Sequence, residues 1–145
     1  MRLAVLALAL IATGAGCASG RHAPTYLAMP GATPRPFSAA VRANGFLFLA
    51  GQLGTDSTGR LAPGGIGPET RQAMTNVRAL LARSGSSLDR VVKCTVFLAD
   101  MREWGAMNEV YATFFAPGRF PARTAAGASG LALDARVEIE CLAAE

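Results

Sequence analysis

One arginine, Arg123, lies in a stretch of otherwise mostly small and apolar residues, F-P-A-R-T-A-A-G, which covers residues 120–127. A charged side chain among such neighbours is stable only when an opposite charge or a ligand pairs with it. The stretch therefore predicts one of two things: an ion pair within the protein, or a site where the guanidinium waits for a ligand.

Two glutamates alternate with apolar residues in the segment V-E-I-E-C. In a strand, Val137, Ile139 and Cys141 face one side, and Glu138 and Glu140 face the other. Neighbouring strands offer apolar residues to the glutamate side, and a sheet face of this mixed kind is often buried against another subunit. We expect an oligomer with carboxylates near its interface, where either glutamate is also a possible partner for Arg123.

The cysteines and the histidine do not form a pattern that would predict a metal site. Cys94 and Cys141 both lie in strand-like segments, so they form either a disulfide or two buried free thiols. The chain has no Cys-x-x-Cys motif and no Cys/His cluster, and its one histidine, His22, stands alone in a polar linker. We expect neither a metal nor a cofactor.

The first segment has the layout of an export signal. Residues 1–16 contain one charge at Arg2, an apolar run too short to span a bilayer, and then small residues up to Cys17. This arrangement resembles a bacterial lipoprotein signal, in which Cys17 is lipidated and becomes the new N-terminus. Plain secretion and an uncleaved segment are the alternatives. The resemblance implies a periplasm-facing lipoprotein of the cell envelope, more often at the outer membrane because Ala18 and Ser19 follow Cys17.

The remaining length bounds one domain. Of 145 residues, 17–35 are expected to form a lipidated tether rich in Ala, Gly, Pro and Ser, and 36–145 a single folded domain. The net charge is +4 and the sequence pI is about 9.5, but the basic residues are scattered. We therefore expect a solvated surface and no nucleic-acid partner.

Periodicity predicts the elements that must position the charged residues. Asn44-Gly45 is a strong hairpin signal between strands at 37–43 and 46–51. A Gly-rich irregular stretch follows at 52–67, and then a helix that Pro68 opens and Gly85 ends. The later elements are a strand at 88–99, a helix at 103–116 that Asp100 could cap, an extended segment at 120–127 and a strand at 135–144.

The second predicted helix has an apolar stripe that we interpret as core, formed by Trp104, Met107, Tyr111 and Phe114. The order strand-strand-helix-strand-helix-strand-strand favours an α+β domain, with one sheet and two helices on one face.

Taken together, these segments resemble the RidA (YjgF) family. The resemblance covers residues 36–145 and rests on the segments G-Q-L-G-T-D-S-T-G-R-L, N-V-R-A-L-L-A-R-S-G-S-S-L-D-R-V-V-K-C-T-V-F-L-A-D-M, N-E-V-Y-A-T-F-F, F-P-A-R-T and V-E-I-E. It implies a chorismate-mutase-like α+β fold and a homotrimer with clefts between subunits. It also implies hydrolysis of reactive enamine and imine intermediates to 2-keto acids and ammonia.

The same resemblance assigns roles to individual residues. Arg123 would hold the substrate carboxylate, Glu138 would orient or polarise the attacking water, and Asn108 would support the ligand by hydrogen bonding. Gly51, which follows the second strand, would allow a close backbone approach to the cleft, or merely a bend.

Three positions depart from the family pattern. Phe37 stands where the family has a tyrosine, Ala50 where it has a serine, and Ala125 where it has a cysteine. The pocket they line would be more apolar, while the charged anchor is kept.

These departures leave a second function open beside the imine deaminase: a non-catalytic, membrane-anchored trimer that binds small carboxylate metabolites. Ribonuclease activity, long attached to part of this family, ranks last because the chain has no histidine pair and no basic track.

Overall fold

A computed structural model describes residues 23–28 and 35–145. The proposed signal segment, Cys17 and His22 lie outside the described residues. In the described part of the chain, seven strands form one sheet, in which the order of neighbours is β1-β2-β3-β7-β5-β6 and β4 pairs with β7. The strands are β1 (Thr25–Leu27), β2 (Ala40–Ala43), β3 (Phe46–Leu49), β4 (Gln52–Leu53), β5 (Val91–Leu98), β6 (Ala122–Gly127) and β7 (Val137–Ala144).

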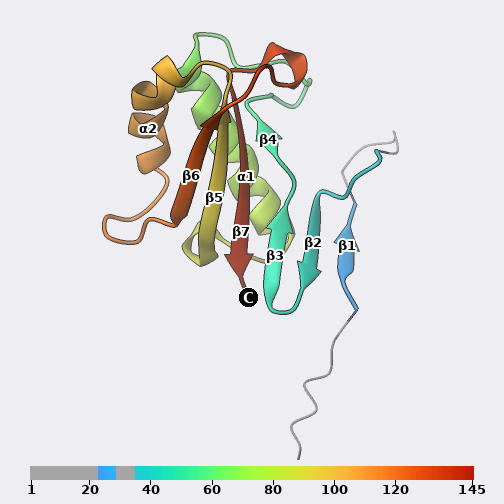
Figure 1. The fold of residues 1–145 in the computed structure, drawn as a ribbon. Helices are drawn as coiled ribbons and strands as arrows, with labels where there is room; N and C mark the ends of the chain where they lie inside the picture. Colours follow the sequence, from blue (N-terminus) through green and yellow to red (C-terminus); the bar gives the residue numbers. More distant parts are fainter. Residues whose placement is uncertain (1–22, 29–34) are drawn as a thin grey trace, which may run out of the picture.

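Two helices, α1 (Ile66–Arg83) and α2 (Trp104–Ala112), lie on one face of this sheet (Figure 1). Three short 3-10 turns separate the longer elements: η1 (Leu88–Arg90), η2 (Met101–Glu103) and η3 (Ala132–Asp134). The strands pair antiparallel except for β5 and β6, which are parallel and joined through α2. The predicted α+β architecture and element order are confirmed.

Two small strands were not predicted. β1 was expected to be part of the tether, yet it pairs with β2 in the register Tyr26↔Val41, and Leu27 is half-buried. β4 was expected to be irregular, yet Gln52 and Leu53 pair with Ile139 and Glu138. Both strands are too short to show an alternating pattern, so only their tertiary partners make them strands.

Several predicted boundaries move by a few residues. The first helix begins at Ile66, before Pro68, and the second ends at Ala112, before the predicted residue 116. The first predicted strand begins at Ala40 because only its last residues pair with β1 and β3. The hairpin is confirmed, since Asn44 and Gly45 both have positive φ, 51° and 78°.

The core lies between α1 and the middle of the sheet. The apolar face of α1 is fully buried at Ala73, Met74, Val77 and Leu81. It packs against the face of β7 that carries Val137, Ile139, Cys141 and Ala143, the face expected from the alternation. Gly85 ends α1 as predicted, with φ of 76° and its N–H donated to the carbonyl of Ala82.

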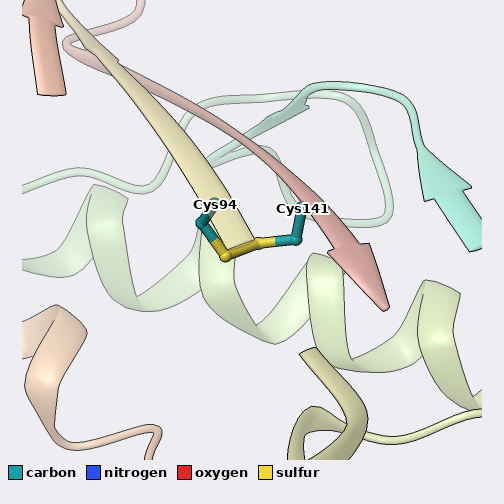
Figure 2. Close-up of a disulfide and its surroundings, with 2 residues drawn as sticks. All are labelled: Cys94 and Cys141. Atoms are coloured by element: carbon teal, nitrogen blue, oxygen red, sulfur yellow. A yellow bond between two sulfur atoms is a disulfide. The ribbon is translucent and has the colours of Figure 1, made fainter. Parts of the chain in front are cut away.

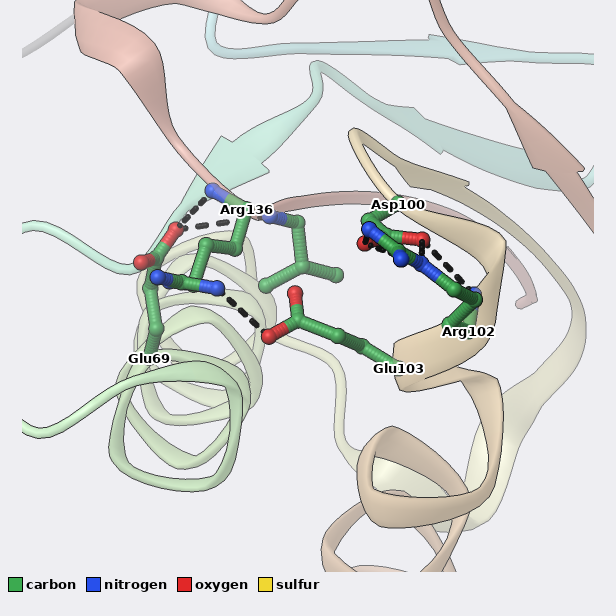
Figure 3. Close-up of polar contacts among 6 residues, drawn as sticks. Glu69, Asp100, Arg102, Glu103 and Arg136 are labelled. Atoms are coloured by element: carbon green, nitrogen blue, oxygen red, sulfur yellow. Dashed lines mark hydrogen bonds and ion pairs between the residues drawn. The ribbon is translucent and has the colours of Figure 1, made fainter.

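A buried carboxylate connects α1 to the start of β7 (Figure 3). Glu69 is only 3% exposed, and its Oε1 accepts the backbone N–H groups of Arg136 at 2.7 Å and Val137 at 3.3 Å. Gly54 makes room for it, because a Cβ there would overlap the Cγ and the carbonyl oxygen of Glu69. These bonds fix where β7 begins.

A second set of polar contacts fixes the start of α2. The guanidinium of Arg136 donates to Oε1 of Glu103, the residue before the helix, at 2.5 Å. Asp100 was expected to cap the helix, but it caps the preceding turn η2, where it accepts the backbone N–H of Arg102 at 2.9 Å. The hydrogen bonds from the Arg102 guanidinium and backbone lower the pKa of Asp100 to about 2, so the cap stays ionised.

A disulfide joins the neighbouring strands β5 and β7 (Figure 2). Cys94 on β5 lies directly opposite Cys141 on β7, and the two residues are 1% and 5% exposed. Of the two alternatives left open by the sequence, the pair is therefore the one observed. The bond crosslinks positions separated by 47 residues.

Reducing this disulfide is expected to lower the free energy of unfolding by about 4 kcal/mol, because a crosslink over such a loop restricts the unfolded chain. Urea unfolding with and without reductant measures the change. The double variant Cys94→Ala/Cys141→Ala is the control, and its unfolding midpoint should not respond to reductant. A wild-type midpoint that also ignores reductant would contradict the prediction.

Candidate functional site

Arg123 lies on β6, at the edge of the sheet, and faces α2. In the parallel pairing of β5 and β6 it is level with Cys94, whose side chain is on the helix face. Its guanidinium carbon lies 4.8 Å from the ring centre of Tyr111 and 5.8 Å from that of Trp104. Both rings belong to α2, so the arginine is held by aromatic faces.

No carboxylate within residues 23–28 and 35–145 lies within 4 Å of the Arg123 guanidinium. The four ion pairs found there join other residues: Arg42 with Glu145, Arg60 with Asp56, Arg102 with Asp100, and Arg136 with Glu103. Within the described part of one chain, Arg123 therefore forms no ion pair with Glu138 or Glu140, and the alternative of such a pair across a subunit interface stays open. The guanidinium edge is available to an anion.

A cavity of about 270 Å³ opens beside the guanidinium, between α2 and the start of β6. Its lining consists of Asn108, Tyr111, Ala112, Phe120, Pro121 and Arg123. Most of these surfaces are apolar, and the one formal charge among them is that of Arg123. The cavity is therefore suited to a small anion that also has an apolar part.

Two polar atoms of cavity residues are buried and have no hydrogen-bond partner among the described residues: Oδ1 of Asn108 and the hydroxyl of Tyr111. Burial raises the pKa of Tyr111 to about 12, although the charge of Arg123 acts in the opposite direction. The phenol is consequently neutral at physiological pH and leaves the positive charge of Arg123 uncompensated.

Glu138 lies on the other face of the sheet. It occupies β7 opposite Phe97 on β5 and Leu53 on β4, on the side turned away from the helices. Its carboxylate rests against the backbone of Gly51, where a Cβ would overlap Oε1. The sequence predicts that something lies close to the Gly51 backbone, and in the structure that group is the side chain of Glu138.

The predicted site residues consequently fall into two groups. Arg123, Asn108 and Ala125 belong to the α2 side, because Ala125 follows Arg123 by two positions on β6. Glu138 and Gly51 belong to the open side of the sheet. With β5 between their strands and opposite faces, Arg123 and Glu138 are roughly 14 Å apart at Cα by strand geometry.

Of the other two predicted positions, Ala50 directly precedes Gly51 and Phe37 lies earlier in the chain. Ala50 donates its backbone N–H to the carbonyl of Ala39, which brings the segment after Phe37 alongside it. Phe37 itself is half exposed, and the guanidinium of Arg35 lies 5.9 Å from its ring centre. One chain therefore contains both halves of the predicted site but does not bring them together.

Trp104 and Tyr111 were missed as site residues. The predicted core stripe is right for Met107, which is fully buried, but wrong for Trp104, which is 44% exposed beside Arg123. The sequence did contain a signal, because Trp104, Asn108 and Tyr111 follow the i, i+4, i+7 spacing of one helix face. Asn108, the polar residue inside that spacing, indicates that this face is not all core, although Tyr111 is itself buried.

In residues 23–28 and 35–145 there is no group of three or more His, Cys, Asp or Glu side chains arranged to hold a metal ion. The same part of the chain has no helix long and apolar enough to cross a bilayer.

Known proteins are similar to this chain in both sequence and fold. The chain is 42% identical over 111 residues to the mouse 2-iminobutanoate/2-iminopropanoate deaminase, covering 76% of this chain and 82% of that protein. It is 45% identical over 109 residues to a RutC family protein of Pyrococcus horikoshii, covering 74% of this chain and 86% of the relative.

Among solved structures, a putative endoribonuclease L-PSP from Entamoeba histolytica superimposes with a TM-score of 0.77 at 38% identity, over 85% of this chain and all of the other. E. coli TdcF, solved with bound serine, superimposes with a TM-score of 0.72 at 30% identity, over 80% of this chain and 92% of the other. The family model described as Endoribonuclease L-PSP matches residues 29–145, and the chain belongs to this family, the RidA (YjgF) family.

Proposed function

We propose that this protein hydrolyses reactive 2-imino acids, and the enamines in equilibrium with them, to 2-keto acids and ammonia. The observation that carries the proposal is the guanidinium of Arg123, which faces a cavity with no carboxylate partner in the described part of the chain. Relatives at about 40% identity are named 2-iminobutanoate/2-iminopropanoate deaminase, which supports the same chemistry here.

In the proposed reaction, Arg123 binds the substrate carboxylate through two parallel hydrogen bonds. Water adds to the carbon of the C=N bond, and Glu138 orients that water and accepts its proton. Glu138 passes that proton to the nitrogen, which gives a carbinolamine, and then accepts the proton of the new hydroxyl and delivers it to the same nitrogen. The C=O bond forms as the C–N bond breaks, which releases ammonia and leaves the 2-keto acid. Asn108, with its unpartnered Oδ1 in the same cavity, is suited to accept a hydrogen bond from the substrate N–H.

This mechanism requires more than one subunit, because Arg123 and Glu138 lie on opposite faces of one sheet. We propose a homotrimer in which the Arg123 half of one chain meets the Glu138 half of its neighbour. The open face of the sheet supports such an assembly, since Phe46 and Phe48 are 39% and 49% exposed and Phe97 lies beside Glu138. This is the apolar setting for carboxylates that the sequence predicts at an interface.

Phe37, Ala50 and Ala125 limit how the substrate is held. In the family pattern, a polar residue at each of these three positions would contact the ligand. Each hydrogen bond lost in this way typically costs about 1 kcal/mol of binding free energy. The charge of Arg123 is the larger contribution and is retained. If the protein binds small carboxylates through Arg123 but does not turn over imines, the non-catalytic trimer is the better description.

The family model's description also names an endoribonuclease. The chain contains one histidine, so a histidine pair for acid–base cleavage of RNA cannot form within a subunit. We therefore favour the small-molecule reaction.

Replacing Arg123 by alanine should lower kcat/KM for imine hydrolysis by at least about 100-fold, because two charge-assisted hydrogen bonds to the substrate are lost. The imine is generated in situ by an amino-acid oxidase, and the remaining imine is trapped with semicarbazide. Arg78→Ala is the matched control, since Arg78 also lies over a ring, that of Phe114, but outside the cavity. Equal activity of the two variants would count against the proposal.

Replacing Gly51 by alanine should displace the Glu138 carboxylate, because the added Cβ would overlap Oε1. We expect kcat to fall by about 10-fold or more, the effect of a misplaced general base, with the thermal midpoint nearly unchanged. Gly130→Ala is the control, since a Cβ there meets no atom within 4 Å. A Gly51→Ala enzyme with wild-type kcat would remove Glu138 from the proposed reaction.

We propose separately that the protein is exported and anchored to the cell envelope through a lipid on Cys17. The buried disulfide between Cys94 and Cys141 supports export, since such bonds persist in oxidising compartments. Wild-type protein should partition with membranes, and Cys17→Ser should be soluble. A wild-type protein that remains in the soluble fraction, or a Cys17→Ser variant that still partitions with membranes, would contradict the anchor.

A further inference from the structure

The guanidinium of Arg123 is held in an unusual way for a half-buried charge. Its contacts within the described chain are aromatic: the ring of Tyr111 at 4.8 Å and the ring of Trp104 at 5.8 Å. An aromatic ring attracts the flat face of a guanidinium and leaves its N–H edges unused. A carboxylate partner would instead occupy those edges and compete with a ligand for them.

The ring of Tyr111 is held by packing, and Trp104 is placed by the start of α2. Tyr111 is 4% exposed and packs against Phe115, with ring centres 5.1 Å apart. Trp104 is the first residue of α2 and directly follows Glu103, which the Arg136 guanidinium holds. The two rings are seven residues apart on one helix, so they approach Arg123 from the same element.

The hydroxyl of Tyr111 adds nothing to this arrangement within the chain. It is buried and has no hydrogen-bond partner, so the ring is the part of the side chain that contacts Arg123. Trp104, by contrast, does not line the cavity, and its contact is with the arginine and not with the space for a ligand.

We propose that Trp104 and Tyr111 form an aromatic clamp that positions the Arg123 guanidinium and keeps its hydrogen-bonding edge free for a carboxylate ligand. The two are positioning residues, acting through Arg123. The inference rests on the proposed function only for the class of ligand, a carboxylate. It therefore applies to a binding protein as well as to an enzyme.

Binding can be followed without catalysis, because Trp104 is the one tryptophan in the chain. The probe is 2-oxobutanoate, a 2-keto acid of the kind the proposed reaction releases. We expect it to change the fluorescence of the wild-type protein with saturation, and Arg123→Ala to abolish the response. A wild-type protein that shows neither a fluorescence response nor heat of binding would overturn the inference.

The clamp is then tested by calorimetric titration of 2-oxobutanoate into ring variants. Trp104→Leu and Tyr111→Leu should each weaken binding about 5-fold, whereas Trp104→Phe and Tyr111→Phe should stay within about 2-fold of wild type, because a ring face is kept. Phe114→Leu is the matched control, since its ring contacts Arg78 elsewhere on the surface, and it should bind as wild type does.

Leucine variants that bind as tightly as wild type, or phenylalanine variants as weak as the leucine ones, would overturn the clamp. Circular dichroism and thermal midpoints identify a variant that fails to fold, and the phenylalanine pair keeps the test decisive in that case. If the wild type also hydrolyses imines, the leucine variants should raise KM more than they lower kcat.

The two proposals fail differently. A protein that binds 2-oxobutanoate in a ring-dependent way without hydrolysing any imine would remove the deaminase activity and keep the clamp. A protein that hydrolyses imines equally well with either ring truncated would keep the deaminase activity and remove the clamp.

Discussion

The register of β7 is the constraint on which the rest of this structure depends. β7 pairs with β3, β4 and β5, and its residues alternate between the packed face and the open face of the sheet. A slip by one residue would turn Glu138 into the core and Val137 out of it. The buried carboxylate of Glu69 fixes where the strand begins, and the disulfide from Cys141 to Cys94 fixes its position against β5.

That register also explains why a single chain contains two half-sites. β5 lies between β6 and β7, and the pleat places Arg123 with the helices and Glu138 with the open face. A cation and an anion that would attract each other strongly at short range are thereby kept apart. Because they are separated, Arg123 and Glu138 do not neutralise each other inside one subunit, and each can interact with another group. In the proposed homotrimer, that group would be a substrate placed between two chains.

The apolar character of the Arg123 cavity has electrostatic consequences. With a neutral tyrosine and mostly apolar walls, the guanidinium charge is weakly screened, and an anion that enters the cavity interacts with it more strongly than it would in water. In the proposed site, Phe37, Ala50 and Ala125 would take polar contacts away from a ligand, and this charge would be the main source of affinity. Such a site discriminates by charge and by apolar contact more than by a set of directed hydrogen bonds.

The features that depend on short spacings can be predicted from the amino-acid sequence alone. The alternation in V-E-I-E-C predicts both faces of β7, Asn44-Gly45 predicts the hairpin, and the apolar face of α1 predicts the helix that covers the sheet. The resemblance to the RidA family added the fold and the identities of Arg123 and Glu138 as site residues. The inferences from spacing succeed because they need only the local period of the backbone, whereas the site roles of Arg123 and Glu138 stay predictions.

The tertiary structure decided what the spacing of residues could not. Strand order, set by the crossover through α2, places Arg123 against Trp104 and Tyr111, and long-range register places Cys94 opposite Cys141. The helical spacing of Trp104 predicts a core position, but its side chain on α2 is 44% exposed, beside the edge strand β6. Pairings of this kind depend on which distant strands are neighbours, and no local period of the chain encodes that.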